Sequence, residues 1–489
     1  MSTEMARILC ALAVGGIVSW QVFIFAQQGI KEFWRRDTLV QGGGLLPLLL
    51  IGMFLLSLFS GAAGDWSDTL RLFGWVVEIF LLISVYFILL ILVLPLLRRY
   101  FRAEACAMLW VIPNCLHLAT LIDNWDWPQW VIPLPTQWLA ALGTVWLTGM
   151  IGVLGWKIGS HLWFRRWLLR GAEEVSDPAV LAVWQEELVR VGEKDQRFTV
   201  VISPQATTPM TIGLFSKSVR VVLPRRHYTP EELKLIFRHE LVHLGREDAW
   251  SKFFLTFCTA VCWFNPLMWL AMNKSAQDLE LSCDEVVVSS LNEGERRRYA
   301  DLILRTAGDG RGFTTCLSAS ASALRYRLKG IVQPPKRRTG AVLVGVATGL
   351  LLFTFGRVGV ACGVGPGAES LFGGEPGNAS LTEAAWTGER YYIPAACRDK
   401  GALTDYLSSL TLYQMVGEYP YPGDGMERVS LTYETPQGEL EADLYGDGIR
   451  VMTSWEESSR KHYYYVSGGL DWEKLEGLLD RWQGGIANG

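Results

Sequence analysis

Long stretches without charged residues constrain the fold of this chain more than any other feature of its sequence. Residues 8–26 and 45–63 are uncharged, residues 72–97 contain a single acidic residue, and residues 138–156 and 340–356 are again uncharged. Each stretch is close to the ~20 residues that a helix needs to cross a bilayer. Half of all residues are hydrophobic and only 19% are charged, which argues against disorder and against an ordinary cytosolic enzyme. The sequence therefore predicts a multi-pass α-helical membrane protein.

Basic residues cluster at alternate ends of these stretches and indicate how the chain crosses the bilayer. The clusters lie at residues 31–36, 98–102, 165–170 and 336–338. They all fall on one side of the bilayer only if residues 105–122 also cross it. These residues form a weaker apolar stretch, which contains a proline, an asparagine and a histidine. Basic loops are kept on the cytoplasmic side. We therefore expect about five spans in residues 1–164, an external N-terminus, and a last transmembrane helix at 340–361.

The chain beyond the last span is acidic, and the predicted orientation places it outside the cell. Residues 362–390 are rich in glycine, serine and proline, which predicts a linker. Residues 391–489 contain several short β-branched and aromatic runs separated by turn residues, followed by an amphipathic pattern. This part is predicted to be a small extracytoplasmic α+β domain. Ligand sensing and a purely structural or protein-contact role are both compatible with it.

The cytoplasmic region, residues 165–335, contains the motif His239-Glu240-Leu-Val-His243. Pro230, followed by two glutamates, predicts the start of the helix that carries it. Residues four apart share a helix face, so both imidazoles can bind one zinc ion. Zinc lowers the pKa of water from ~15.7 to ~7, and Glu240 stands beside the first histidine, where its carboxylate can take the proton. Chance matches occur, but two of only six histidines have this spacing on a helix with an apolar side.

Short β-branched runs at 198–202 and 219–223, upstream of this motif, predict two strands. Downstream, residues 253–272 are uncharged and are interrupted by Asn265-Pro266. A single crossing here would reverse the side of everything that follows. We therefore expect a membrane-associated helical hairpin at 251–272 rather than a further span.

A third protein ligand is needed, because zinc in a catalytic site binds three side chains and keeps one position open. No histidine follows at the spacing of the extended motif, since position 249 is alanine. The acidic segment QDLELSCDE offers four carboxylates, at Asp278, Glu280, Asp284 and Glu285. Glu280 and Asp284 share a face if this segment is a helix, so one can bind zinc while the other orients a ligating histidine. Spacing alone leaves the choice open.

Five motifs in this order resemble the BlaR/MecR family of bacterial membrane zinc metallopeptidases of the antirepressor type. They are SPQATTPMTIGLF with VVLP, HELVHLGRED, WFNPLMW, DLELSCDE and RRRYADLIL. The resemblance covers residues 165–335 and implies a gluzincin-type α+β metallopeptidase domain. It implies zinc ligands His239, His243 and Glu280, the catalytic base Glu240, and Asp284 as an outer partner of the ligands. The tail lacks the SDN and KTG motifs of that family's penicillin-binding sensor, so β-lactam sensing is not expected.

Three functions follow from these observations. The leading prediction is a signalling metalloendopeptidase of a bacterial cell membrane, which cleaves a cytoplasmic regulator, by resemblance a repressor, or its own inner loop in response to an outside signal. A housekeeping membrane protease resembling the CAAX prenyl proteases and a catalytically silent receptor are the alternatives. The acidic outer domain and the WFNP segment favour the first. The expected partners are the lipid bilayer and a protein substrate; a homodimer is left open, and direct binding of nucleic acid is not expected.

Overall fold

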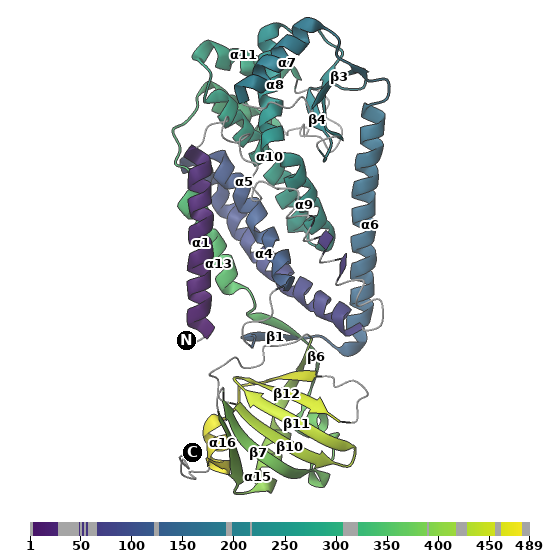
Figure 1. Ribbon diagram of the computed structural model, residues 1–489, viewed down its shortest axis with the longest axis vertical. Helices are drawn as coiled ribbons and strands as arrows, with labels where there is room; N and C mark the ends of the chain where they lie inside the picture. The colour runs from purple at the N-terminus through teal and green to yellow at the C-terminus, as the bar shows by residue number, and fades with distance from the viewer. Residues whose placement is uncertain are drawn as a thin grey trace, which may run out of the picture. The chain divides into compact units, whose positions relative to one another are not determined.

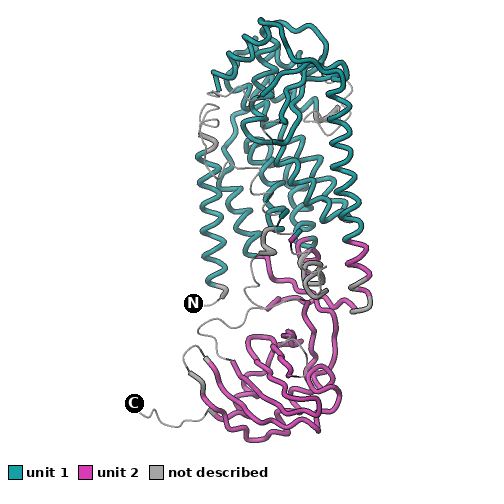
Figure 2. Tube along the Cα trace, turned by 45° about the vertical axis from the view of Figure 1, so that its right-hand side comes forward, with its two compact units in different colours: residues 1–55, 80–118, 147–353 teal, residues 56–79, 119–146, 354–489 magenta. Residues whose placement is uncertain are grey.

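The computed structural model describes residues 3–27, 48, 51–52, 55–56, 66–121, 127–191, 198–215, 218–306, 321–388, 391–416, 428–454 and 461–481. The chain forms two compact units (Figure 2). Unit 1 comprises residues 1–55, 80–118 and 147–353, and unit 2 comprises residues 56–79, 119–146 and 354–489. Unit 1 is mainly helical and contains the HExxH motif, whereas unit 2 contains a large β-sheet.

Three helices in the described part of the chain are long and apolar enough to cross a membrane. They lie within α1 (Thr3–Gln27), α4 (Trp66–Tyr100) and α6 (Thr136–Leu168) (Figure 1). Many of their large apolar side chains are exposed, such as Leu12, Leu92 and Trp163. Exposing such side chains to water costs free energy, whereas lipid tails solvate them. The spans predicted at 8–26, 72–97 and 138–156 are therefore confirmed as helices, while most of the predicted span 45–63 lies outside the described residues.

Two other predicted spans differ from one continuous α-helix. Within residues 105–121, α5 (Ala103–Val111) is followed by a 3-10 helix, η2 (Ile112–Leu121). The helix changes type at Ile112, next to Pro113, which has no amide hydrogen to donate. The span predicted at 340–361 is helical only over α13 (Ala341–Thr354), and strand β6 begins at Val358. Gly356, whose φ is 78°, ends this helix in the left-handed conformation that glycine adopts readily.

Helix α13 packs closely on α1 in unit 1 through glycine residues. A Cβ atom built at Gly345 would lie 2.4 Å from the carbonyl oxygen of Gly15, and one built at Gly15 would lie 2.6 Å from the carbonyl oxygen of Gly345. Small residues let two apolar helices approach this closely, which is how helices associate in lipid. The first and last helices of unit 1 are therefore joined by backbone contact.

The region with the HExxH motif combines helices with a four-stranded mixed sheet of order β2-β3-β5-β4. Strands β3 and β5 are parallel, and β4 is antiparallel to β5. The strands are β2 (Glu173–Glu174), β3 (Thr199–Ser203), β4 (Met210–Ile212) and β5 (Arg220–Pro224). The two predicted strands are confirmed. The prediction missed β4, because its three residues stand between Pro209 and Gly213 and give too short a pattern.

Helices α7 (Pro178–Val191) and α8 (Pro230–Gly245) pack together against this sheet. Trp184 of α7 and Phe237 of α8 stack edge to face in a core that also includes Val221 of β5. Helices α11 (Glu293–Thr306) and α12 (Ala321–Val332) complete the region. The amphipathic face of α8 thus fixes the orientation of the HExxH motif.

Between α8 and α11 in the chain, α9 (Asp248–Val261) and α10 (Pro266–Val288) form the expected helical hairpin. Asn265 caps α10, since its Oδ1 accepts a hydrogen bond of 3.0 Å from the amide of Leu267. Asp278, a fully buried residue of α10, accepts hydrogen bonds of 2.8 Å from both Arg98 of α4 and Trp110 of α5. These contacts fix α10, which carries the acidic motif, against two apolar helices.

Unit 2 is built on a ten-stranded sheet of order β1-β6-β9-β13-β12-β11-β10-β7-β8-β14. Its strands are β1 (Trp130–Pro133), β6 (Val358–Pro366), β7 (Ser380–Gly388), β8 (Tyr391–Cys397), β9 (Thr411–Met415), β10 (Arg428–Thr435), β11 (Gly438–Tyr445), β12 (Gly448–Thr453), β13 (Lys461–Val466) and β14 (Leu479–Arg481). Helices α14 (Gly367–Phe372), α15 (Lys400–Ser409) and α16 (Trp472–Leu478) contribute Leu371, Leu403 and Leu475 to its core. This unit is an α+β structure.

The segment predicted as a linker, residues 362–390, instead contains secondary structure. The end of β6, helix α14, the 3-10 helix η4 (Pro376–Asn378) and β7 lie within it. Leu371, Phe372 and Trp386 are buried in the core and anchor the segment. Its glycine-rich composition was misleading, because a few large apolar residues supply the burial while the glycines serve the turns between elements.

Candidate metal centre

Helix α8 presents the HExxH motif from a well-defined start. The side chain of Thr229 accepts a hydrogen bond from the amide of Glu232, and the Glu232 carboxylate accepts one from the amide of Thr229. This reciprocal capping, with Pro230 in the first turn, determines where the helix begins. Leu241, fully buried on the opposite side, faces the core, so the two histidines are directed towards α10.

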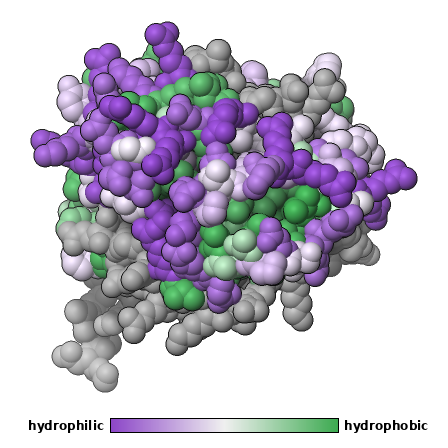
Figure 3. Space-filling view, turned by 90° about the horizontal axis from the view of Figure 1, so that it is seen from above, coloured by the Kyte–Doolittle hydropathy of each residue, from purple (hydrophilic) through white to green (hydrophobic). Residues whose placement is uncertain are grey.

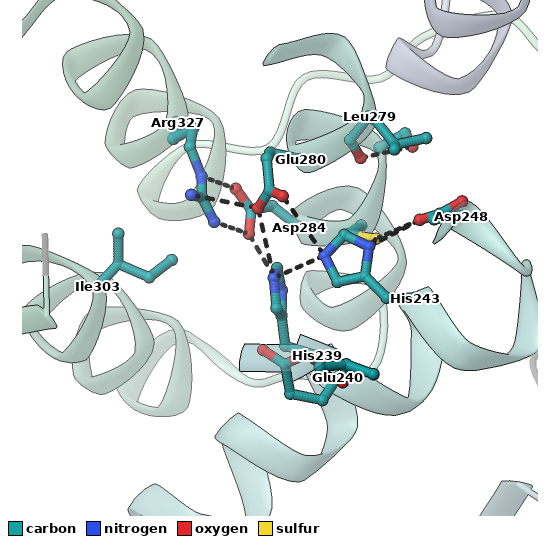
Figure 4. A network of polar contacts seen from close by, with 12 residues as sticks. His239, Glu240, His243, Asp248, Leu279, Glu280, Asp284, Ile303 and Arg327 are labelled. Carbon is teal, nitrogen blue, oxygen red and sulfur yellow. Dashed lines mark hydrogen bonds and ion pairs between the residues drawn. The ribbon is translucent and has the colours of Figure 1, made fainter. Parts of the chain in front are cut away.

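His239, His243 and Glu280 converge on one point (Figure 4). The two Nε2 atoms of the histidines are 3.2 Å apart. Glu280 Oε2 lies 3.5 Å from Nε2 of His239, and Glu280 Oε1 lies 3.6 Å from Nε2 of His243. One donor atom from each of the three residues lies within 4.8 Å of the others. The structure thus brings together the three residues that the sequence predicts as ligands.

His243 is oriented by a residue close to it in sequence. Its Nδ1 donates a hydrogen bond of 2.7 Å to Oδ2 of Asp248, which directs Nε2 at the centre. Asp248 reaches this position through a sharp turn at Glu247, which has a left-handed φ of 52°. Arg246 lies 3.5 Å from the other oxygen of Asp248 and donates to Ser282 of α10 at 2.6 Å. A short connection between α8 and α9 therefore builds this side of the centre.

His239 is oriented by residues far from it in sequence. Its Nδ1 donates to the hydroxyl of Tyr299 at 2.8 Å, and this hydroxyl donates to Oδ1 of Asp284, also at 2.8 Å. Arg327 of α12 holds Asp284 with two hydrogen bonds of 2.7 and 2.9 Å. Asp284 itself lies 3.6 Å from Nδ1 of His239, so it acts mainly through Tyr299. Again Nε2 is left free to bind a metal.

The charges around Glu280 favour its ionised form, which is the form that binds a metal ion. Burial alone would raise the pKa of its carboxyl, but the charge of the His243 imidazole, the close contacts with both histidines and the Arg327 guanidinium hold the pKa well below its usual range. For His243 itself, burial alone would lower the pKa, but Cys283, Glu280 and Asp248 raise it well above its ordinary value. A positive charge is therefore favoured between these groups. A metal ion can supply that charge in place of the proton.

One buried atom provides a test of whether the residues fit a metal ion. Oε1 of Glu280 is buried and makes no hydrogen bond to any residue that the structure describes. Buried carboxylate oxygens normally have a partner, since leaving one without a partner costs free energy. Two imidazole nitrogens and a carboxylate also form a donor set that suits zinc. The residues therefore fit a single zinc ion.

Glu240 is buried beside this centre and is not one of its three donors. Its Oε2 accepts a hydrogen bond of 2.7 Å from the hydroxyl of Thr211 in β4. This contact links the carboxylate to the sheet and leaves its other oxygen, Oε1, available. A carboxylate that follows a candidate metal ligand in the chain is a candidate for a general base.

Four of the residues that make these contacts were not predicted from the sequence. Thr211, Asp248, Tyr299 and Arg327 were not predicted to have a role, although Thr211, Asp248 and Tyr299 lie inside three of the quoted motifs. Asp284 was predicted to orient a histidine, and in the structure it does so through Tyr299. A carboxylate a few residues beyond the second histidine was the available signal for Asp248. No comparable signal existed for Arg327.

Two imidazoles and a carboxylate around one point, with a further carboxylate next to them in the chain, form a candidate metal centre on an α+β scaffold. Comparison with known proteins agrees. Residues 131–331 match the family model described as BlaR1 peptidase M56, which is a peptidase family. Over this region the chain is similar to proteins of the BlaR/MecR family.

Two relatives show the extent of this similarity. The regulatory protein BlaR1 of Bacillus licheniformis is 26% identical over 194 residues, which cover 38% of this chain and 31% of that protein. The methicillin resistance mecR1 protein of Staphylococcus aureus is 26% identical over 170 residues, which cover 32% of this chain and 28% of that protein. The matched region thus spans about a third of the length of these relatives or slightly less.

Proposed function

We propose that this protein is an integral-membrane zinc metalloendopeptidase of a signalling type. His239, His243 and Glu280 would hold the zinc ion, and Glu240 would act as the catalytic base. The observation that carries the proposal is the convergence of three donor atoms within 4.8 Å. One of them belongs to a carboxylate that has an oxygen, Oε1, without a hydrogen bond to any described residue. Asp248, Tyr299 and Asp284 would keep the two imidazoles in the tautomer that binds metal.

The side chains divide the chemistry of peptide hydrolysis among them. A bound zinc ion supplies Lewis acidity, which polarises the carbonyl of a peptide bond and lowers the pKa of water. Glu240 accepts the proton of the attacking water at Oε1, because Thr211 occupies Oε2. The same carboxyl then donates this proton to the amide nitrogen of the leaving peptide. Burial of Glu240 keeps this proton from exchanging with bulk water during the step.

The position of Thr211 also suggests how a substrate would bind. Thr211 lies in β4, the strand at one edge of the four-stranded sheet. An extended peptide can add to such an edge and hydrogen-bond to its backbone. Paired with β4, a peptide would lie next to Glu240, which Thr211 contacts. This arrangement favours cleavage within an extended segment of a protein.

The orientation and the substrate are part of the same proposal. Seen from above, the end of the molecule with α7, α8 and α11 is mostly hydrophilic (Figure 3), as expected for a region in water. The basic clusters next to the predicted spans would keep residues 165–335 in the cytoplasm and the C-terminal α+β domain outside. The relatives carry the names of regulatory and resistance proteins. A cytoplasmic regulator, or the chain itself, is therefore the proposed substrate.

The two alternatives make different demands on the site. A silent receptor has no need of a buried carboxylate held beside the ligands, as Glu240 is by Thr211. A housekeeping protease resembling the CAAX prenyl proteases needs the same centre but not an outer domain with its own core, such as the one around Leu403 and Leu475. Both observations favour the signalling peptidase.

The proposal is tested by separating zinc binding from cleavage. Full-length protein in detergent is incubated with β-casein, and new N-termini in the casein and in the protein itself are identified by mass spectrometry. Glu240→Gln should retain zinc and lose cleavage, because it removes the base and leaves the three ligands. Glu231→Gln, on the exposed side of the same helix, should behave like wild type. Normal cleavage by Glu240→Gln would contradict the mechanism, and absence of cleavage by the wild type would favour the silent receptor.

A further inference from the structure

A cavity of about 570 Å³ lies within unit 1, on the side of Asp248 that faces the apolar helices. Its wall is formed by α1, α5, η2, α6, α9, α10 and α13, and most of the lining is apolar. Typical lining residues are Val18, Val22, Val111, Leu255, Met272 and Val344. The volume lies within the range of about 300–1,000 Å³ that is usual for small-molecule sites. Part of this wall, on α1 and α6, belongs to helices that can cross a membrane.

A lysine at the cavity wall has no hydrogen-bond partner in the described part of the structure. Lys252 of α9 lines the cavity, and its Nζ is buried without a hydrogen bond to any described residue, although its charge helps to lower the pKa of Asp248. A buried ammonium group without a hydrogen bond costs free energy, which an anionic hydrogen-bond acceptor would offset.

The other charged groups of the wall are already engaged. Lys157 lies 4.9 Å from the ring centres of both Trp156 and Trp269. Arg246 donates to Ser282, and both acids of the wall, Glu104 and Asp248, interact with this arginine. Lys252 is therefore the group best placed to bind a negatively charged ligand.

The apolar part of the wall restricts what else the ligand can be. A peptide in this cavity would bring backbone amides and carbonyls that need hydrogen-bond partners, which valine, leucine and methionine side chains do not supply. An acyl chain needs no such partners and gains from burial against apolar side chains. A neutral apolar compound would leave the ammonium group of Lys252 without a hydrogen bond. Only an amphiphile with an acyl chain and an anionic head group satisfies both parts of the wall.

We propose that this cavity binds one anionic phospholipid, with an acyl chain among α1, α5, α9 and α13 and its phosphate group at Lys252. The site lies against the connection of Arg246 and Asp248 that supports His243. It is separate from the metal centre, because none of the three proposed ligands lines the cavity. The lipid would complete the packing of the metallopeptidase region where it meets the apolar helices.

Native mass spectrometry of the full chain tests this proposal. Protein treated with a metal chelator, so that the outcome is independent of the zinc site, is released from nanodiscs of phosphatidylglycerol or phosphatidylcholine. Wild type should retain one phosphatidylglycerol, and about fivefold less phosphatidylcholine, as expected for one lysine near an anionic head group. Lys252→Met, which keeps the length of the side chain, should abolish this preference, whereas Lys329→Met, on an exposed part of α12, should not.

A second variant separates the acyl-chain part of the site from the charge. Ala276 of α10 lines the cavity, so Ala276→Trp should fill it and reduce retention of both lipids. Retention equal to wild type in both Lys252→Met and Ala276→Trp would overturn the proposal. A bound peptide, or equal retention of the two lipids by wild type, would overturn it as well.

Discussion

The two histidines of the metal centre are held in different ways. His243 is oriented by Asp248, which follows it by five residues, at 2.7 Å. His239 is oriented by a chain of hydrogen bonds through Tyr299 and Asp284 to Arg327, contributed by α11, α10 and α12. The His243 side is thus built mainly by the end of α8 and the start of α9, with Cys283 of α10 at 3.3 Å from Nδ1 of His243. The His239 side exists only when three further helices are packed in place.

This difference indicates which side of the centre responds to movements of distant helices. Movement of α11 or α12 would change the hydrogen bonds of His239 while leaving Asp248 and His243 unaffected. Moreover, Arg327 lies 3.5 Å from Oε2 of Glu280, so the same distant helix also touches the shared ligand. A centre built in this way keeps one ligand fixed and makes the other depend on tertiary structure.

The largest effect is expected from a change at Glu280, whose carboxylate lies close to both histidines. Glu280→Gln should reduce zinc affinity by more than the ~100-fold that marks the upper end for loss of an outer partner, because it removes one of three protein ligands. Glu285→Gln is the matched control, since Glu285 accepts hydrogen bonds from Ala103 and Arg337 and not from either histidine. Zinc per protein is measured by elemental mass spectrometry. Full zinc occupancy in Glu280→Gln would show that another residue completes the site.

The next prediction compares the two sides directly. Asp248→Asn and Tyr299→Phe should each lower zinc affinity by ~10–100-fold, with Asp248→Asn at the upper end. Asp248→Asn removes a charge that stabilises the imidazole, whereas Tyr299→Phe keeps the ring packing and leaves Asp284 at 3.6 Å from Nδ1 of His239. Affinities come from zinc titration against a competing chelator. A greater loss in Tyr299→Phe than in Asp248→Asn would reverse the comparison.

The same contrast explains how much of the centre could be predicted from the sequence. The spacing within HExxH and the four-residue spacing of Glu280 and Asp284 depend only on helix geometry, and the structure places these side chains as that geometry requires. Their proposed catalytic and metal-binding roles remain predictions. Arg327 could not be predicted, because its position results from the packing of α12 on α10.

The larger fold shows the same limit. The long helices α1, α4 and α6 follow from runs of apolar residues, which determine their structure locally. The order of strands in unit 2 depends on contacts between distant segments. Local patterns therefore predicted elements, and tertiary packing decided which of them are neighbours.

A smaller effect is expected from Arg327→Lys, which sharpens the comparison within the His239 side. Lysine keeps the charge but cannot form the two parallel hydrogen bonds that Arg327 makes with Asp284. Zinc affinity should fall less than in Tyr299→Phe, by ~10-fold or less, because Tyr299 still connects Asp284 with His239. Arg325→Lys, at an exposed position of the same helix, is the control. A loss as large as that of Glu280→Gln would mean that Arg327 has a more direct role.

The smallest effect is expected from Thr229→Ala, because the cap of α8 serves both histidines equally. The change removes the hydrogen bond from the amide of Glu232 and should lower the stability of the metal-free protein by about 1 kcal/mol. Zinc affinity should remain as in wild type, since fraying is limited to the first turn and His239 lies two turns further on, next to the buried Leu241. Thermal unfolding in detergent with chelator measures the first quantity, and zinc titration measures the second. Thr229→Ser, which keeps the hydroxyl, should restore stability. A tenfold loss of zinc affinity in Thr229→Ala would mean that the cap, rather than the buried face of α8, sets the direction of the two imidazoles, and the distinction between a local and a distant side would then fail.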